Sequence, residues 1–294
     1  MGIRLSKVLA SIFGLVLVHT AGLSQTTDLL RMEYTHIPEN DFGISTSRYR
    51  ALFNLPLKMG KEDYLVAGSE YNTYRFEFNN PLPFPSNSLE EIHIIDVNLG
   101  YILKWNPSWR FVGIATPRLA SNFVEGIENN DFLFNFSALV WKEKPDIDKP
   151  FRLILGLTFN SATGLPFPLP LINYQKRFHP NWSYSLGIPR MDLKHYIRKK
   201  HILQTALFLD GYFVNIQNDI LLPGNVVGTT VSLSALVGAL GYQFKISKYI
   251  SFYSLLGYSL IQDGLLRDGG RNRAYTLNDE GNIYLRTGFK ISIF

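Results

Sequence analysis

The sequence predicts an all-β fold, a transmembrane antiparallel up-and-down β-barrel of about 14 strands. Apolar and polar residues alternate with a period of two over long segments, as in strands that have two different faces. After residue 24 no segment has the roughly 18 consecutive apolar residues of a transmembrane helix. Aromatic residues make up 14% of the chain and gather near the ends of the alternating segments, as they do at the membrane–water interfaces of barrels.

The N-terminus has the three parts of a secretory signal peptide. Arg4 and Lys7 precede the apolar run 8–18, and small residues follow up to Ser24. The run is too short to span a bilayer, which takes about 20 residues, and a lipoprotein anchor would need a cysteine, of which the chain has none. We therefore expect a signal peptide over residues 1–24, cleaved near Ser24-Gln25, and a single outer-membrane β-barrel domain over 25–294.

The strands are clearest where the alternation is strict. It runs through five segments, 48–57, 93–103, 131–141, 151–160 and 203–213. In the first of them Tyr49 and Phe53 share one parity, and Arg48 and Arg50 share the other. A soluble secreted β-protein would show the same alternation. Segments of a dozen residues favour membrane strands, which need about 9–11 residues, over the shorter strands of a soluble sandwich.

Aromatic side chains near the segment ends predict the girdles of a membrane barrel. The residues expected there are Tyr71, Tyr74, Phe76, Trp105, Trp109, Trp141, Trp182, Tyr184 and Tyr249.

The connections predict the topology, because outer-membrane barrels have short periplasmic turns and longer outer loops. Short turns are expected at 58–62, 106–108, 143–149, 179–181, 198–200 and 247–248, and long connections at 37–43, 78–90, 121–130, 217–228 and 262–280. Fourteen strands follow if 182–188 and 191–197 form two short strands that meet at Pro189. Twelve strands follow if 163–200, which is rich in proline, forms a loop or plug.

The last segment predicts the strand that closes the barrel. Its apolar parity includes Ile283, Leu285, Phe289, Ile291 and Ile293, while the terminal Phe294 falls on the other parity. This offset indicates either a residue just beyond the strand or a β-bulge.

The signal peptide, the alternating strands, the aromatic ends and Phe294 together resemble Gram-negative outer-membrane β-barrels. Gly187-Ile188-Pro189 and Tyr196 are similar to a segment of an uncharacterised porin-like family of such proteins, a domain of unknown function. The resemblance implies that the barrel-assembly machinery recognises residues 281–294, and outer-membrane lipid is then the surrounding partner.

The sequence offers no catalytic motif, and we expect no cofactor, no metal and no nucleic-acid partner. The histidines are not spaced as metal ligands, and the net charge of +5 is spread along the chain. An enzyme acting on lipid or envelope components is the alternative function. It would draw on His195 with Asp192, or on His93 near Asp96.

Charged residues on the polar parity of the strands are candidates for the lumen, because ionisable groups at membrane depth must face water or one another. The candidates are Arg48, Arg50, Asp96, Arg152, Asp210, Arg286 and Lys290. They either pair across a plugged interior and hold a structural barrel together, or line a narrow passive channel for small polar or anionic solutes.

Overall fold

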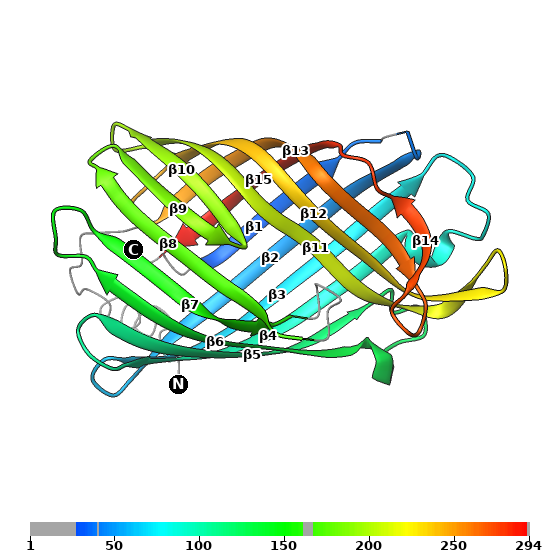
Figure 1. Cartoon of the computed structure of the whole chain (residues 1–294), viewed down its shortest axis with the longest axis horizontal. Coiled ribbons are helices and arrows are strands. Elements are labelled where there is room, and N and C mark those ends of the chain that lie inside the picture. The colour runs from blue at the N-terminus through cyan, green and yellow to red at the C-terminus, as the bar shows by residue number, and fades with distance from the viewer. Residues whose placement is uncertain (1–27, 40, 161–166, 293–294) are drawn as a thin grey trace, which may run out of the picture.

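The protein is a closed, antiparallel, up-and-down β-barrel (Figure 1). A computed structural model describes residues 28–39, 41–160 and 167–292, so the predicted signal peptide, Ile293 and Phe294 lie outside the described residues. The strands are β1 (Asp28–Ile37), β2 (Ile44–Met59), β3 (Asp63–Phe78), β4 (Glu91–Lys104), β5 (Trp109–Ser121), β6 (Phe132–Lys144), β7 (Phe151–Phe159), β8 (Leu169–His179), β9 (Trp182–Ile188), β10 (Arg190–Ile197), β11 (His201–Leu222), β12 (Val226–Lys245), β13 (Ile250–Arg267), β14 (Arg273–Asn278) and β15 (Ile283–Ser292).

Fourteen of these strands form the ring. Each strand from β1 to β13 pairs with the next, and β15 pairs with β13 on one edge and with β1 on the other. The strand β14 pairs with the outer part of β13 and lies at one end of the ring. The short strands β9 and β10 are both paired members of the wall. The prediction of fourteen strands is therefore confirmed, and the alternative of twelve is wrong.

The outer surface of the ring is apolar, as the alternation predicted. Leu99, Leu157, Leu209 and Leu256 keep between 49% and 59% of their surface exposed. Exposing such side chains to water costs about 25 cal/mol for each Å², and soluble monomers do not expose apolar bands of this extent. The exposed band is the lipid-facing surface of a membrane-spanning barrel.

Among the described residues, no helix combines the length and the apolar character needed to cross a membrane.

Three of the predicted girdle aromatics face inward instead. Tyr74 is 4% exposed and packs on Tyr212 of β11, with ring centroids 4.7 Å apart. Phe76 shares the parity of Tyr74 and packs on the same ring. Trp141 stacks beneath the guanidinium of Arg152. Tyr71 lies three residues before Tyr74 and is 42% exposed, because an odd separation places two strand residues on opposite faces.

We call the end of the barrel that carries the long connections the outer end. It has less loop and more strand than the sequence predicted. The expected long connection 217–228 is a hairpin in which Gly224 and Asn225 adopt the positive φ of a tight turn. The expected loop 262–280 is largely the hairpin of β13 and β14. Both hairpins form because their apolar side chains pack into a hydrophobic core. Leu222 and Leu266 are no more than 3% exposed.

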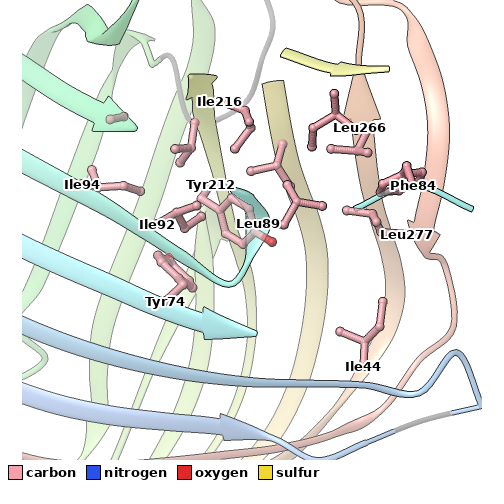
Figure 2. Close-up of a cluster of buried hydrophobic side chains, with 14 of the residues drawn as sticks. Ile44, Tyr74, Phe84, Leu89, Ile92, Ile94, Tyr212, Ile216, Leu266 and Leu277 are labelled. Atoms are coloured by element: carbon pink, nitrogen blue, oxygen red, sulfur yellow. The ribbon is translucent and has the colours of Figure 1, made fainter. Parts of the chain in front are cut away.

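This outer core fills the barrel end between opposite walls (Figure 2). It combines side chains of β2, β3, β4 and the end of β5 with those of β11, β12, β13 and β14. The connection 79–90 folds into it, since Phe84 and Leu89 are 7% and 1% exposed. Asn215 of β11 also pairs with Ser121 of β5, which closes the wall across the outer end.

Candidate functional site

Two contacts across the barrel divide its interior. Arg48 of β2 bonds Asp210 of β11, with 3.1 Å between Nη1 and Oδ1, and Tyr74 packs on Tyr212 beside that pair. These strands are not neighbours in the sheet, so their side chains meet only by crossing the interior. We call the side formed by β1–β4 and β11–β15 the packed half, and the side formed by β5–β10 the accessible half.

The central charge cluster consists of Arg48, Asp210, Tyr284 and Arg286. The Asp210 carboxylate accepts hydrogen bonds from Arg48, from Tyr284 Oη at 2.6 Å and from Arg286 Nη2 at 2.7 Å. Arg286 also donates to Thr35. The cluster joins β2, β11 and β15, which lie far apart in the sequence, through a single carboxylate.

A second cluster lies next to it and consists of Asp28, Arg31, Glu33, Arg50 and Glu70. Arg50 donates two bonds to Glu70, at 2.8 and 2.7 Å, and one to Glu33 at 2.8 Å. Arg31 pairs with Asp28 and Glu33.

Asn72 links the two clusters, because it accepts from Arg48 and donates to Glu70. Together the clusters hold four guanidinium groups and four carboxylates. The network is therefore electrically balanced, which suits a structural role at membrane depth.

Apolar side chains fill much of the remaining packed half. Ala206, Phe208, Val237 and Leu255 form a buried group next to Tyr284. Two cavities of about 20 and 40 Å³ lie between the central charge cluster and the outer core. Cavities of this size hold one or a few water molecules. Gln262 lines both, and its buried Oε1 has no hydrogen-bond partner among the described residues.

The accessible half has a different charge arrangement. Glu143 of β6 pairs with both Arg110 of β5 and Arg152 of β7, and Trp141 donates to the same carboxylate at 3.1 Å. Two guanidinium groups therefore share one carboxylate on three adjacent strands.

A similar excess of cations occurs on β10. Asp192 contacts Arg190 at 3.3 Å and Lys194 at 3.4 Å. The Arg190 side chain is 32% exposed and the Lys194 side chain 16%, so both cations keep access to solvent. At the border between the halves, Asp96 and Arg118 form a two-bond pair with distances of 2.6 and 2.8 Å.

Apolar side chains that face inward from the accessible half are partly exposed rather than buried. Val112, Ile114, Leu139 and Ile154 belong to this group. Their cross-strand partners place them on the inner face with Ser137 and other polar residues. The opposite wall does not cover these side chains as it covers the outer core.

The structure places the candidate lumen residues in different groups. Arg48, Asp210 and Arg286 meet in the central charge cluster, and Arg50 joins the second cluster. Lys290 also faces inward on β15, where its ammonium lies over the Tyr253 ring. The remaining candidates, Asp96 and Arg152, have their partners on β5 and β6.

Several residues of these groups were not among the candidates for the lumen. Glu33, Glu70, Arg110, Glu143, Asp192 and Lys194 all have the inward parity of their strands. That parity is visible in the sequence, but which side chains pair with one another depends on the order of the strands in the closed ring.

The two histidine–aspartate pairs do not meet. His93 faces outward and accepts or donates a bond to Tyr71 at 2.9 Å, whereas Asp96 faces inward. His195 stacks on Trp182 at 4.3 Å, whereas Asp192 faces inward. A separation of three residues puts each pair on opposite faces of the wall. Within the described residues, no three His, Cys, Asp or Glu side chains gather as metal ligands would.

The family comparison covers most of the chain. A family described as a domain of unknown function, DUF6268, matches residues 41–292. The chain belongs to this family. A comparison with curated proteins found no relative.

Solved barrels are similar to the chain at low identity. The KdgM porin in complex with disordered oligogalacturonate is 10% identical, with a TM-score of 0.37 over 89% of this chain and 98% of that one. The NanC porin is 10% identical, with a TM-score of 0.38 over 90% and 99%. LpxR from Salmonella typhimurium is 9% identical, with a TM-score of 0.39 over 90% and 99%. Likeness at this level carries no substrate or activity over to this chain.

Proposed function

We propose that this member of the DUF6268 family is a narrow, porin-like passage of the outer membrane that favours small polar or anionic solutes. The passage runs along the accessible half. The observation that carries the proposal is the charge of that half, where Glu143 and Asp192 are each shared by two cations. Charged groups on a pore wall select ions of the opposite sign, because the low-dielectric surroundings strengthen their field.

The position of the passage follows from the packing. The outer core and the balanced clusters occupy the packed half, and the two cavities between them admit only a few water molecules. Val112, Ile114, Leu139 and Ile154, which face inward from β5–β7, remain partly exposed. Solutes that cross the barrel would therefore move beside β5–β10.

The test is ion selectivity in planar bilayers for the double variant Arg110→Gln/Lys194→Gln. Each carboxylate keeps one cationic partner, Arg152 or Arg190, so the change removes charge without leaving an unpaired carboxylate. A unit charge at about 4 Å in water contributes about 1 kcal/mol. We expect the ratio of anion to cation permeability to fall about fivefold at low salt.

The matched control is Arg75→Gln, which removes a cation whose side chain is 62% exposed. This variant should keep the selectivity of the wild type. An unchanged ratio in the double variant would contradict a passage along β5–β10.

A closed structural barrel is the second candidate function, favoured by the balanced network and the outer core. It predicts no conductance steps from protein whose gel migration is heat-modifiable, a property of folded barrels. The absence of conductance steps would contradict the proposed passage and support the structural role.

We also propose the predicted route to the membrane. The signal peptide would be removed near Ser24-Gln25, and the barrel-assembly machinery would recognise residues 281–294. N-terminal sequencing of protein purified from outer membranes tests the first step, and a mature chain that begins elsewhere would contradict it. A variant with Phe289→Ser, which breaks the apolar face of β15, should accumulate outside the membrane if the second step holds.

A further inference from the structure

The end of the barrel that holds the short turns has an uneven charge distribution. Three successive turns, 176–181, 197–201 and 244–250, contain no acidic residue. We call five of their cations the basic arc: Lys176, Arg198, Lys199, Lys200 and Lys248. Among the described residues, no member of the basic arc forms an ion pair with a carboxylate.

The three turns are neighbours on the ring. They connect β8 to β9, β10 to β11, and β12 to β13, and the intervening strands are paired. A backbone bond of 2.8 Å from Lys245 N to Lys200 O joins two of the turns directly. The basic arc is therefore one continuous surface rather than three separate clusters.

The remaining short turns differ. Lys58 and Lys61 lie next to Glu62 and Asp63, and Lys104 pairs with Glu62. The turn 143–149 alternates lysines with Glu143, Asp146 and Asp148. These two turns have mixed charge and the turn 106–108 has no charged residue, and so the positive surface is confined to one side of the barrel end.

The basic arc adjoins the lipid-facing surface. Ile197, Ile246, Tyr249 and Ile250 lie within or beside its turns and are 38–48% exposed. The Lys248 ammonium lies over the Tyr249 ring at 5.4 Å. Cations beside exposed aliphatic and aromatic side chains are characteristic of the headgroup level of a membrane, where phosphates lie within reach.

We propose that the basic arc binds the headgroups of anionic phospholipids in the periplasmic leaflet. Short turns mark the periplasmic end of such barrels, and charge complementarity selects lipids with net negative charge over zwitterionic ones. Each Lys or Arg near a membrane surface contributes about 1 kcal/mol to such binding. This inference is independent of whether solutes pass through the barrel.

The test is native mass spectrometry of the full-length protein in detergent, titrated with phosphatidylglycerol or with phosphatidylcholine. The wild type should retain phosphatidylglycerol preferentially, and salt should weaken the retention. The variant Arg198→Gln/Lys199→Gln/Lys200→Gln should bind phosphatidylglycerol about a hundredfold more weakly at low salt, with phosphatidylcholine unaffected.

The control variant Lys58→Gln/Lys61→Gln/Lys149→Gln removes the same number of charges from the mixed turns and should keep the wild-type preference. Heat-modifiable gel migration verifies that both variants are folded. An equal loss in the two triple variants, or equal binding of the two lipids by the wild type, would overturn the proposal. Complete competition by inorganic phosphate at equal concentration would assign the arc to a free anion instead of a lipid.

Discussion

The two halves of the barrel use the same kinds of side chain in different ways. In the two charge clusters of the packed half, guanidinium groups and carboxylates occur in equal number, and some bond across the interior, as Arg48 and Asp210 do. In the accessible half, one carboxylate serves two cations, as Glu143 does for Arg110 and Arg152. A balanced network presents no net charge to solutes, whereas an excess of one sign acts on ions from solution. Charge inside a barrel therefore indicates function only after its partners are known.

The largest expected difference between the halves is in the free energy of unfolding, which substitution of Asp210 should lower most. Asp210→Asn leaves Arg48 and Arg286 without their carboxylate, and loss of one partner of a buried ion pair costs about 3–5 kcal/mol. Asp192→Asn in the accessible half should cost less, because Arg190 and Lys194 keep access to solvent. Guanidinium-induced unfolding in detergent micelles measures both. If the two variants lost the same amount of unfolding free energy, the halves would not differ in how much their charged groups contribute to stability.

Truncation of Leu89 tests whether the outer core closes the packed half. Leu89→Ala removes a side chain that is 1% exposed, and core truncations of this kind cost about 2–5 kcal/mol. Leu99→Ala on the lipid-facing surface is the control and should cost much less, since lipid replaces the lost contacts. A loss no larger than that of the control would show that the connection 79–90 is not part of the core.

Substitution of Gln262 should raise the free energy of unfolding rather than lower it. Its buried Oε1 has no partner among the described residues, and an unsatisfied buried polar group costs about 1–3 kcal/mol. Gln262→Leu, which keeps the side-chain volume, should therefore stabilise the barrel by about that amount in the same unfolding assay. Destabilisation would instead indicate that water in the adjoining cavities satisfies the amide.

The smallest expected effect is on the local order of the turn between β13 and β14, which lies outside the membrane-spanning strands. Asp268 accepts hydrogen bonds from Asn272 and Gly270, which hold the pKa of its carboxyl below the usual range. The turn is therefore stabilised at neutral pH, and this contribution is lost as the pH falls through the lowered pKa.

Limited proteolysis at Arg271 measures the state of this turn. Asp268→Ala should accelerate cleavage at neutral pH without changing global unfolding. An unaltered cleavage rate would show that these hydrogen bonds do not order the turn.

Alternation along the strands determined the wall of the barrel. It predicted which side of β2, β4, β6 and β7 faces lipid, and the structure agrees at Phe53, Leu99, Phe134 and Leu157. Turn lengths favoured fourteen strands over twelve, and the structure contains the two short strands that meet at Pro189. These features are local, because the orientation of a side chain on a strand depends only on its position in the pleat.

Parity also explains the errors in the aromatic girdles. Tyr74 lies directly opposite Arg48 on the neighbouring strand, and Phe76 shares its inward parity, but proximity to a segment end suggested the interface instead. The outer hairpins were missed for a related reason. The segments around Leu222 and Leu266 resemble loops in composition, and they become strands only because opposite walls meet over them in the outer core.

The sequence by itself thus determined the all-β class, the lipid-facing band and the inward placement of the candidate charged residues, and it favoured fourteen strands over twelve. Only the tertiary structure decided which charges neutralise one another. Arg48 and Asp210 are 162 positions apart in the chain, and Glu33 of β1 meets Tyr253 of β13 across Gly288 of the intervening strand β15. Such pairs depend on closure of the barrel, because a strand fixes the direction of each side chain while the curvature of the whole ring determines what it meets.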